Sequence, residues 1–295
     1  MRSFFCPTFA NFNAPNCTML NSSRVLRSFV LLSLILSGSS CASANREDDG
    51  WIDLFDGKSL DGWVANLGTR GDYKSQPLDD IFTVNDGTIH VYRDAPNRTK
   101  QYNANLRTKN SYSSFRLQVE YRWLDNRFQP RHGAVRDAGI LFHIHTDPDS
   151  VWPPSVEMQL GGGEPGAPYV SGDIWIIGNT RAKSPAAMEG TAYYYKPEGP
   201  IVEFSGIFPN EEGHKRASYT SVAATKPHGE WNLAEVMVHG ADRAEYYLNG
   251  KLVSEVTDMR YREADGEWQP LAFGQISLQA EWAELQYRTV RIKPL

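Results

Sequence analysis

Three observations predict an all-β fold for this chain. Short runs of alternating apolar and polar residues follow one another along the sequence, separated by Gly, Pro, Asn and Asp. No long stretch repeats its apolar residues at the helical period. All eight Trp and all fourteen Tyr, which favour strands, lie after residue 44. The chain is therefore expected to form a β-sandwich, a fold that commonly reaches this length as one domain.

Turn residues divide the chain into its expected strands. Asn85-Asp86-Gly87 and Leu248-Asn249-Gly250 predict tight hairpins, because Asn-Gly and Asp-Gly permit the positive φ angles of two-residue turns. The segment from Thr180 to Pro200 is rich in Ala, Gly, Pro and Tyr, and is expected to be a long loop that flanks the site as a lid. The expected strands are Phe82-Val84, Thr88-Tyr92, Asn105-Thr108, Phe115-Leu124, Ala138-His145, Ser155-Leu160, Asp173-Ile177, Ile201-Phe204, Ala217-Ala223, Leu233-His239, Arg243-Leu248, Leu252-Val256, Gln275-Ala280 and Leu285-Ile292.

Residues 1–44 have the features of a secretory signal peptide. They contain no Asp or Glu, and an apolar run at 29–36 follows two arginines. The run is too short to span a membrane, and Ala42-Ser43-Ala44 has the small-x-small form of a cleavage site, so the mature chain is predicted to begin near Asn45. Residues 45–295 are then expected to form a single domain of an exported protein.

Two features of the leader leave alternatives open. Met19 is a second translation start that would give a signal peptide of ordinary length. Gly38-Ser39-Ser40-Cys41 loosely resembles a bacterial lipobox, although Gly38 stands where Leu is usual. Lipidation at Cys41 and simple export are both retained, and a lipid anchor is the one membrane attachment that the sequence suggests.

The composition after the leader argues against disulfides and against nucleic acid. The three Cys are at positions 6, 17 and 41, so the mature chain has none. A chain of about 250 residues buries enough core to be stable without them. The leader holds three of the 30 basic residues and no acidic ones, which leaves 27 basic against 35 acidic residues and a net charge of −8. Because binding to phosphate backbones needs a basic face, no nucleic-acid partner is expected.

Polar residues at alternate positions of three strands predict a chemical wall on one sheet. Side chains in a strand point alternately to its two faces, and each of these polar residues has apolar neighbours that would enter the core. If the three strands lie near one another, two imidazoles, two carboxylates and an amide converge on one concave face. These residues are His143 and His145, Glu157 and Gln159, and Asp173 with Trp175.

The mature chain also carries several motifs in a characteristic order. They are Trp51-Ile52-Asp53-Leu54-Phe55-Asp56-Gly57-Lys58-Ser59-Leu60-Asp61-Gly62-Trp63, Phe115-x-Leu117-x-x-Glu120-Tyr121-Arg122, Ala138-Gly139-Ile140-Leu141-Phe142, Ser155-Val156-Glu157-Met158-Gln159, Gly229-Glu230-Trp231-Asn232, and Gly274-Gln275-Ile276-Ser277-Leu278-Gln279 with Arg291-Ile292. In this order and spacing they resemble the bacterial 3-keto-disaccharide hydrolase family over nearly the whole mature chain. Asp137-Ala138-Gly139 replaces the usual Asn-Ser-Gly, and Trp175 replaces the commoner Tyr, so the chain resembles a subgroup.

The resemblance implies a concanavalin-A-like, two-sheet jelly-roll sandwich, the architecture of lectins and glucanases. It also implies an exported bacterial enzyme, in the periplasm or the cell envelope, that cleaves glycosides already oxidised to a ketone at sugar carbon 3. Such a ketone acidifies the hydrogen on carbon 2 and lets the glycosidic oxygen leave carbon 1 by elimination; addition of water would complete net hydrolysis. This chemistry needs a base for the carbon-2 proton and an electrophile for the developing enolate oxygen.

Candidate residues for these roles come from the chemical wall. Glu157 or His143 is expected to be the base, with Arg122 or a divalent metal ion as the electrophile. Imidazole and carboxylate together suit zinc or a similar ion, so His143, His145 and Glu157 are the candidate metal ligands. Gln159 is expected to bind sugar hydroxyls.

The remaining candidates have structural alternatives. Asp173 and Asp137 either contact the sugar or cap turns beside Gly172 and Gly139. Trp175 and Trp152 either stack on sugar rings or fill the core.

Two other functions stay open from the sequence. A non-catalytic carbohydrate-binding module of the same fold would need aromatic platforms and amides but no general base. An ordinary glucanase would need paired carboxylates across the scissile bond. In that case the partner of Glu157 would have to be Asp173 or Asp137.

Overall fold

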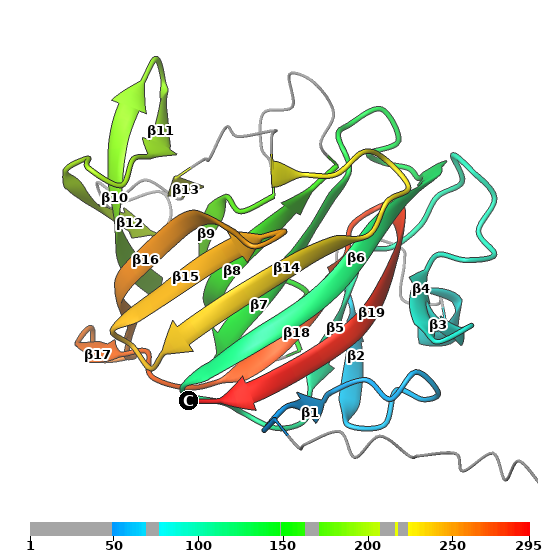
Figure 1. Cartoon of the computed structure of the whole chain (residues 1–295), viewed down its shortest axis with the longest axis horizontal. Coiled ribbons are helices and arrows are strands. Elements are labelled where there is room, and N and C mark those ends of the chain that lie inside the picture. Colours follow the sequence, from blue (N-terminus) through cyan, green and yellow to red (C-terminus); the bar gives the residue numbers. More distant parts are fainter. Residues whose placement is uncertain (1–48, 69–76, 148, 163–170, 207–215, 218–223) are drawn as a thin grey trace, which may run out of the picture. The chain divides into compact units, whose positions relative to one another are not determined.

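Two antiparallel β-sheets make up the body of the chain (Figure 1). The structure, a computed structural model, describes residues 49–68, 77–147, 149–162, 171–206, 216–217 and 224–295. The predicted signal peptide of residues 1–44, with Met19 and Cys41, lies outside these residues. Glu47–Leu295 form one compact unit. No helix within the described ranges is long and apolar enough to cross a membrane.

The larger sheet has twelve strands among the described residues. In spatial order the strands are β11 (Ala192–Tyr195), β10 (Thr180–Glu189), β16 (Lys251–Arg262), β15 (Arg243–Leu248), β14 (Asn232–His239), β6 (Phe115–Arg127), β19 (Ala283–Pro294), β4 (Thr88–Val91) and β3 (Phe82–Asn85), with β1 (Ile52–Asp53) on β19, β12 (Ile201–Ser205) on β10 and β17 (Trp268–Pro270) on β16.

The smaller sheet has seven strands in the described part of the chain, and it carries the motifs of the predicted site. A 3-10 turn, η1 (Leu78–Asp80), precedes β3. In spatial order the strands of the smaller sheet are β13 (Arg216–Ala217), β9 (Ile174–Ile177), β8 (Ser155–Gly161), β7 (Asp137–Ile144), β18 (Gln275–Ala280), β5 (Ala104–Thr108) and β2 (Trp63–Leu67).

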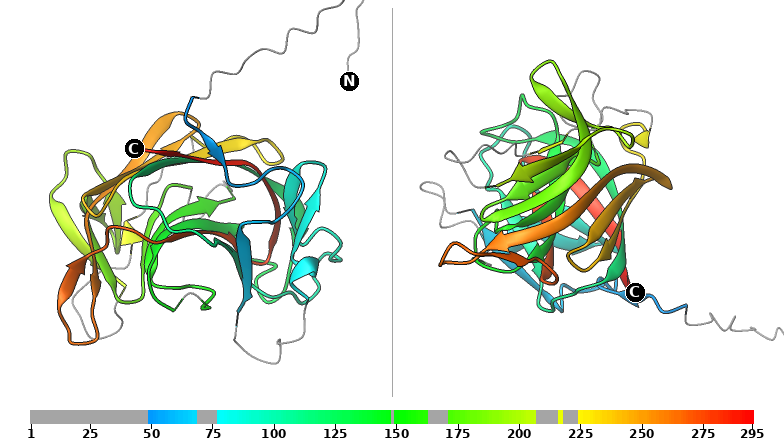
Figure 2. Two further views of the ribbon diagram at one scale, coloured as in Figure 1. Left: turned by 90° about the horizontal axis from the view of Figure 1, so that it is seen from below. Right: turned by 90° about the vertical axis from the view of Figure 1, so that its left-hand side faces the viewer.

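The core lies between the two sheets, which Figure 2 shows as stacked, curved layers with the smaller sheet on the concave side. From the larger sheet, Leu117 and Val119 of β6 are fully buried, and from the smaller sheet Ile140 of β7 and Met158 of β8 are fully buried. The alternate residues of β7 and β8 therefore point to the opposite, concave face. This is the two-sheet all-β sandwich that the sequence predicts.

Both predicted hairpins are present. Asn85 pairs with Thr88 across a turn in which Asp86 has a φ of 48° and Gly87 a φ of 72°. The Leu248–Lys251 pairing closes the second hairpin in the same way. Positive φ at both central residues matches the twist of the flanking strands, which explains the Asp-Gly and Asn-Gly sequences.

The predicted lid at 180–200 is wrong. This segment forms β10 and β11, and β10 pairs with β16, β12 and β11. Side chains from Thr180 to Ser184 alternate between buried and partly exposed, but the buried ones are small, so the sequence shows no large apolar residues at period two. The pairing partners come from other parts of the chain. The predicted strand at 217–223 begins in β13, while residues 218–223 lie outside the described ranges.

Candidate active site

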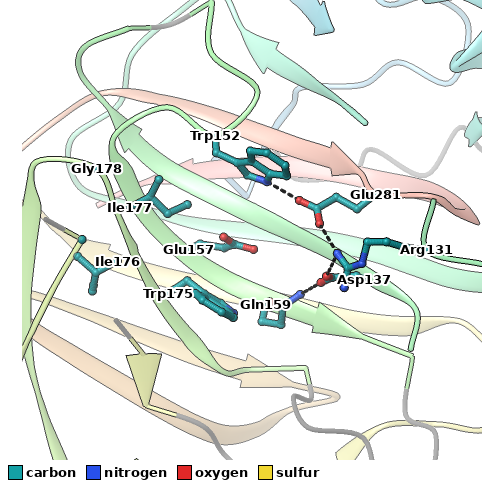
Figure 3. Close-up of a pocket in the computed structure, with 11 residues that line it drawn as sticks. Arg131, Asp137, Trp152, Glu157, Gln159, Trp175, Ile176, Ile177, Gly178 and Glu281 are labelled. Carbon is teal, nitrogen blue, oxygen red and sulfur yellow. Dashed lines mark hydrogen bonds and ion pairs between the residues drawn. The ribbon is translucent and has the colours of Figure 1, made fainter. Parts of the chain in front are cut away.

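A pocket of about 410 Å³ lies on the outer, concave face of the smaller sheet (Figure 3). This volume is within the range of small-molecule sites. Strand β7 contributes an acid, β8 an acid and an amide, and β9 an aromatic wall, while the remaining side chains come from loops and from the end of β18. The lining residues are Arg131, Asp137, Trp152, Glu157, Gln159, Trp175, Ile176, Ile177, Gly178, Gly206 and Glu281.

Glu157 lies in the middle of the pocket, between Trp152 and Trp175 (Figure 3). Its neighbours in β8, Val156 and Met158, are fully buried in the core, so alternation turns Glu157 to the concave face. Only 5% of Glu157 is exposed. Burial raises its pKa well above the usual range, and the negative charges of Glu281 and Asp137 raise it further.

A second acid, Glu281, is linked to the pocket's cation. Arg131 Nη1 lies 2.6 Å from Asp137 Oδ2 and 3.3 Å from Glu281 Oε2. Trp152 Nε1 donates a hydrogen bond of 2.5 Å to the other oxygen of Glu281. Burial and the charge of Asp137 raise the pKa of Glu281 to about 8, against the opposing effects of Trp152 and Arg131. Glu281 therefore keeps its proton at neutral pH.

The three acids and one guanidinium set the charge of the pocket. Full ionisation of Asp137, Glu157 and Glu281, each of them buried, would place three negative charges against the positive charge of Arg131, the one cation among the described lining residues. Like charges so close oppose each other's ionisation. The group can therefore hold a proton on one carboxyl while another accepts one, as acid–base chemistry requires.

Gln159 of β8 is bonded to the first residues of β7. Its Nε2 donates hydrogen bonds to Asp137 Oδ1 and, at 2.7 Å, to the carbonyl oxygen of Ala138. Both hydrogen bonds join β8 to β7, so Gln159 orients Asp137 for its ion pair with Arg131.

Buried tyrosines of the larger sheet fix the site strands from the core side. The Tyr246 hydroxyl donates to the carbonyl oxygen of Glu157 at 3.3 Å, and the Tyr287 hydroxyl donates to that of Gln279 at 2.7 Å. Both rings are fully buried. The backbone beneath the pocket is thus tied to the opposite sheet, which favours a preorganised site.

The prediction that His143 and His145 share a face with Glu157 is wrong. His143 has a φ of 54°, and the pairing of β7 with β18 shifts register at this point, which indicates a bulge. Its ring is fully buried, with Nδ1 2.9 Å from the carbonyl oxygen of Leu271 and Nε2 3.1 Å from the carbonyl oxygen of Ser113. Burial lowers the pKa of His143 to about 4.

His145 also lies away from the pocket, against Tyr261, with ring centroids 4.6 Å apart. The predicted metal-ligand set of His143, His145 and Glu157 is therefore not assembled. Among the described residues, no three His, Cys, Asp or Glu side chains come together as a metal would require.

Arg122 lies on the other sheet, in β6. Its Nε donates to Gln286 Oε1 at 2.7 Å, and its guanidinium lies 4.7 Å from the ring centre of Trp231. The guanidinium of Arg288 lies 3.9 Å from the same ring centre. The core neighbours Tyr121 and Trp123 show that Arg122 points to the outer face of the larger sheet. The sequence prediction that Arg122 faces the substrate is therefore wrong.

Of the other predicted residues, all but one line the pocket. Trp152, Trp175 and Asp137 line the pocket with Glu157 and Gln159, whereas Asp173 is fully buried and is not a lining residue. Sequence reasoning missed Arg131 and Glu281. Glu281 had a signal, since it continues the period-two series of Gln275, Ser277 and Gln279, whereas Arg131 lies in a loop without any pattern.

Comparison with known proteins agrees with these features. A family model described as a 3-keto-alpha-glucoside-1,2-lyase-like domain matches residues 50–293. The chain belongs to this family. The match covers all the pocket residues named above, so the pocket belongs to a glycoside-acting domain. No curated protein matches the chain.

Several solved structures are similar to this chain at low identity. A protein of Parabacteroides distasonis, provisionally assigned as a glycosyl hydrolase, has 18% identity and a TM-score of 0.45, covering 83% of this chain and 99% of its own. The β-glucanase of Bacillus licheniformis has 10% identity and a TM-score of 0.43, covering 84% and 100%. The carbohydrate-binding module CBM66 of Bacillus subtilis has 12% identity and a TM-score of 0.37, covering 79% and 95%.

Proposed function

We propose that this chain is an exported enzyme that cleaves 3-keto-glycosides, with proton abstraction at sugar carbon 2 followed by elimination of the glycosidic oxygen. The observation that carries the proposal is that Glu157 and Glu281 line one pocket, with Glu157 between Trp152 and Trp175 (Figure 3). Family membership supports the substrate class. The predicted leader supports export from the cytoplasm, by lipidation at Cys41 or by simple secretion.

Glu157 is the base in this mechanism. Its raised pKa makes its ionised form a stronger base than an ordinary carboxylate, which suits a carbon acid next to a ketone. Glu157 takes the proton from carbon 2, and the electron pair moves toward the ketone oxygen at carbon 3. The Arg131 guanidinium, the cation of the pocket lining, stabilises the negative charge on that oxygen.

Glu281 is the acid in the second half of the reaction. The enolate re-forms the ketone as the bond between carbon 1 and the glycosidic oxygen breaks, leaving a double bond between carbons 1 and 2. Glu281, protonated at neutral pH, gives its proton to the leaving oxygen. Glu157 now holds the substrate proton, and return of a proton to Glu281 resets the pair. Addition of water to the double bond completes net hydrolysis.

The two tryptophans define where the sugar binds. Trp152 and Trp175 lie on either side of Glu157 in the pocket (Figure 3). Aromatic rings bind the apolar faces of sugar rings, and the indole N–H of Trp152 is already bonded to Glu281. A sugar ring stacked on one of these indoles would turn its other face, and with it the axial hydrogen on carbon 2, toward Glu157.

The test compares a chromogenic 3-keto-glucoside with its unoxidised parent, using wild type and Glu157→Gln. We expect release from the keto compound alone, and loss of at least 100-fold in kcat for the variant, the scale of a missing general base. Glu235→Gln is the matched control, because Glu235 is equally buried but lies in β14, bonded to Arg116 at 2.8 Å. Full turnover by Glu157→Gln would refute the assignment of the base.

A second candidate is an ordinary glycoside hydrolase, favoured by the presence of one protonated and one ionisable carboxyl in the same pocket. It predicts release from the unoxidised parent. A non-catalytic binding module predicts sugar binding with release from neither compound.

A further inference from the structure

Gln279 of β18 is a buried amide for which the fold gives no evident structural role. Only 1% of the residue is exposed. Neither its Oε1 nor its Nε2 has a hydrogen-bond partner among the described residues. Leaving both ends of a buried amide unpaired is costly, and such groups in native proteins usually have a functional reason.

The location of this amide is fixed by Gly139. A Cβ atom on Gly139 would lie 2.0 Å from Glu157 Oε1 and 2.5 Å from Gln279 Oε1. Since both oxygens lie so near a single point, they are no more than 4.5 Å apart. The carboxyl of Glu157 and the amide of Gln279 therefore both lie next to the space that a side chain at position 139 would fill.

The neighbour on the other side of Gln279 is already engaged. In the pairing of β18 with β5, Gln279 lies opposite Asn105. Asn105 Nδ2 donates to the carbonyl oxygens of Ser150 at 3.0 Å and Val151 at 3.1 Å, and Asn105 Oδ1 accepts from Asn66. The Gln279 amide, which has no hydrogen-bond partner in the described part of the chain, therefore lies near the carboxyl of Glu157.

We propose that Gln279 is a positioning residue for Glu157, holding its carboxyl group over Gly139 and donating a hydrogen bond to its ionised form. This rests on the proposed role of Glu157 as base. A half-turn of the amide exchanges Oε1 for Nε2, so the same side chain accepts from the protonated acid and donates to the carboxylate. Because hydrogen bonds to charged groups are the stronger ones, the net effect favours the carboxylate.

Other charges act on Glu157 at the same time. Glu281 at the end of β18 and Asp137 of β7 both favour its protonated form. Arg131 contacts those two acids rather than Glu157. From the core side, the Tyr246 hydroxyl reaches only the backbone of Glu157. Gln279 is therefore a neutral donor placed to offset the charge of Asp137 and, once Glu281 ionises, the charge of Glu281 as well.

The experiment measures the titration of Glu157 directly, by NMR of the 13C-labelled carboxyl, assigned through its absence in Glu157→Gln. In Gln279→Leu we expect the Glu157 midpoint to rise by about one unit, the order of one hydrogen bond to a charged group. The acid limb of the kcat profile should move by the same amount, with little change in KM. Ser277→Ala is the matched control, since Ser277 lies two residues away on the same strand and its buried Oγ is also unpartnered.

An unchanged Glu157 midpoint in Gln279→Leu would overturn the proposal. If that variant does not fold, Gln279→Glu keeps the shape of the side chain and replaces the donor, and a midpoint that does not rise there has the same consequence. The titration needs no substrate. A wild-type protein inert toward 3-keto-glucosides would refute the proposed function while leaving the interaction itself measurable.

Discussion

Gly139→Ala is the smallest change that separates the chemistry of the pocket from its fold. The new methyl carbon would lie 2.0 Å from Glu157 Oε1, where real contacts are not shorter than 3.0 Å, so the carboxyl has to retreat by at least 1 Å. A misplacement of about 1 Å in a reacting group costs on the order of 100-fold in rate. Turnover of a 3-keto-glucoside should therefore fall by about that factor.

The stability of the same variant should change little. Gly139 does not have a positive φ, and the atoms that must move are the ends of two side chains rather than backbone. Ala in place of Gly in a strand contributes roughly 0.5–1 kcal/mol, which offsets the displacement. Thermal unfolding should thus stay near that of wild type.

Gly133→Ala is the control for Gly139→Ala, because a Cβ on Gly133 meets no atom within 4 Å. It should leave both turnover and unfolding unchanged. Turnover of Gly139→Ala within threefold of wild type, with the fold intact, would show that the position of the Glu157 carboxyl does not limit the reaction.

Three further outcomes follow from the structure. Trp152→Phe keeps a ring but removes the hydrogen bond that lowers the pKa of Glu281, so the alkaline limb of the kcat profile, expected near 8 in wild type, should move upward; an unmoved limb would remove Glu281 from the role of acid. In steady-state assays Arg131→Gln should reduce kcat by at least 100-fold, while Arg122→Gln should leave kcat unchanged. Equal losses of kcat in the two variants would contradict the placement of Arg122 on the larger sheet. Burial lowers the pKa of His143 from 6.5 to about 4, so unfolding takes up a proton and the free energy of unfolding falls as the pH drops from 6.5 to 4. In denaturant titrations the free energy of unfolding of His143→Gln should fall by about 3 kcal/mol less than that of wild type over this range. Parallel pH dependences of the two proteins would refute this.

Period-two alternation predicted the face of the smaller sheet wherever the strands are regular. Glu157, Gln159 and Trp175 lie in the pocket because Val156, Met158 and Ile174 fill the core on the other side. The hairpins were predictable for a similar reason, since Asp86-Gly87 and Asn249-Gly250 carry their φ preference locally.

The errors arise where long-range structure overrides the local pattern. The bulge at His143 turns that side chain away from the face of Glu157, and nothing in the sequence around it marks a bulge. Arg122 alternates correctly within β6, but its strand belongs to the other sheet. Arg131 and Glu281 meet Asp137 only through folding, and such meetings have no signature in one sequence.

The most direct test of the mechanism follows the hydrogen on carbon 2. A 3-keto-glucoside carrying deuterium at that position would be compared with the protium compound in kcat/KM. Abstraction by Glu157 predicts a primary isotope effect well above one. It also predicts that the protium compound, when turned over in heavy water, gives a hydrated product that carries solvent deuterium at carbon 2. Equal rates for the two substrates, with the carbon-2 hydrogen retained in the product, would contradict elimination and return the pocket to ordinary glycoside hydrolysis.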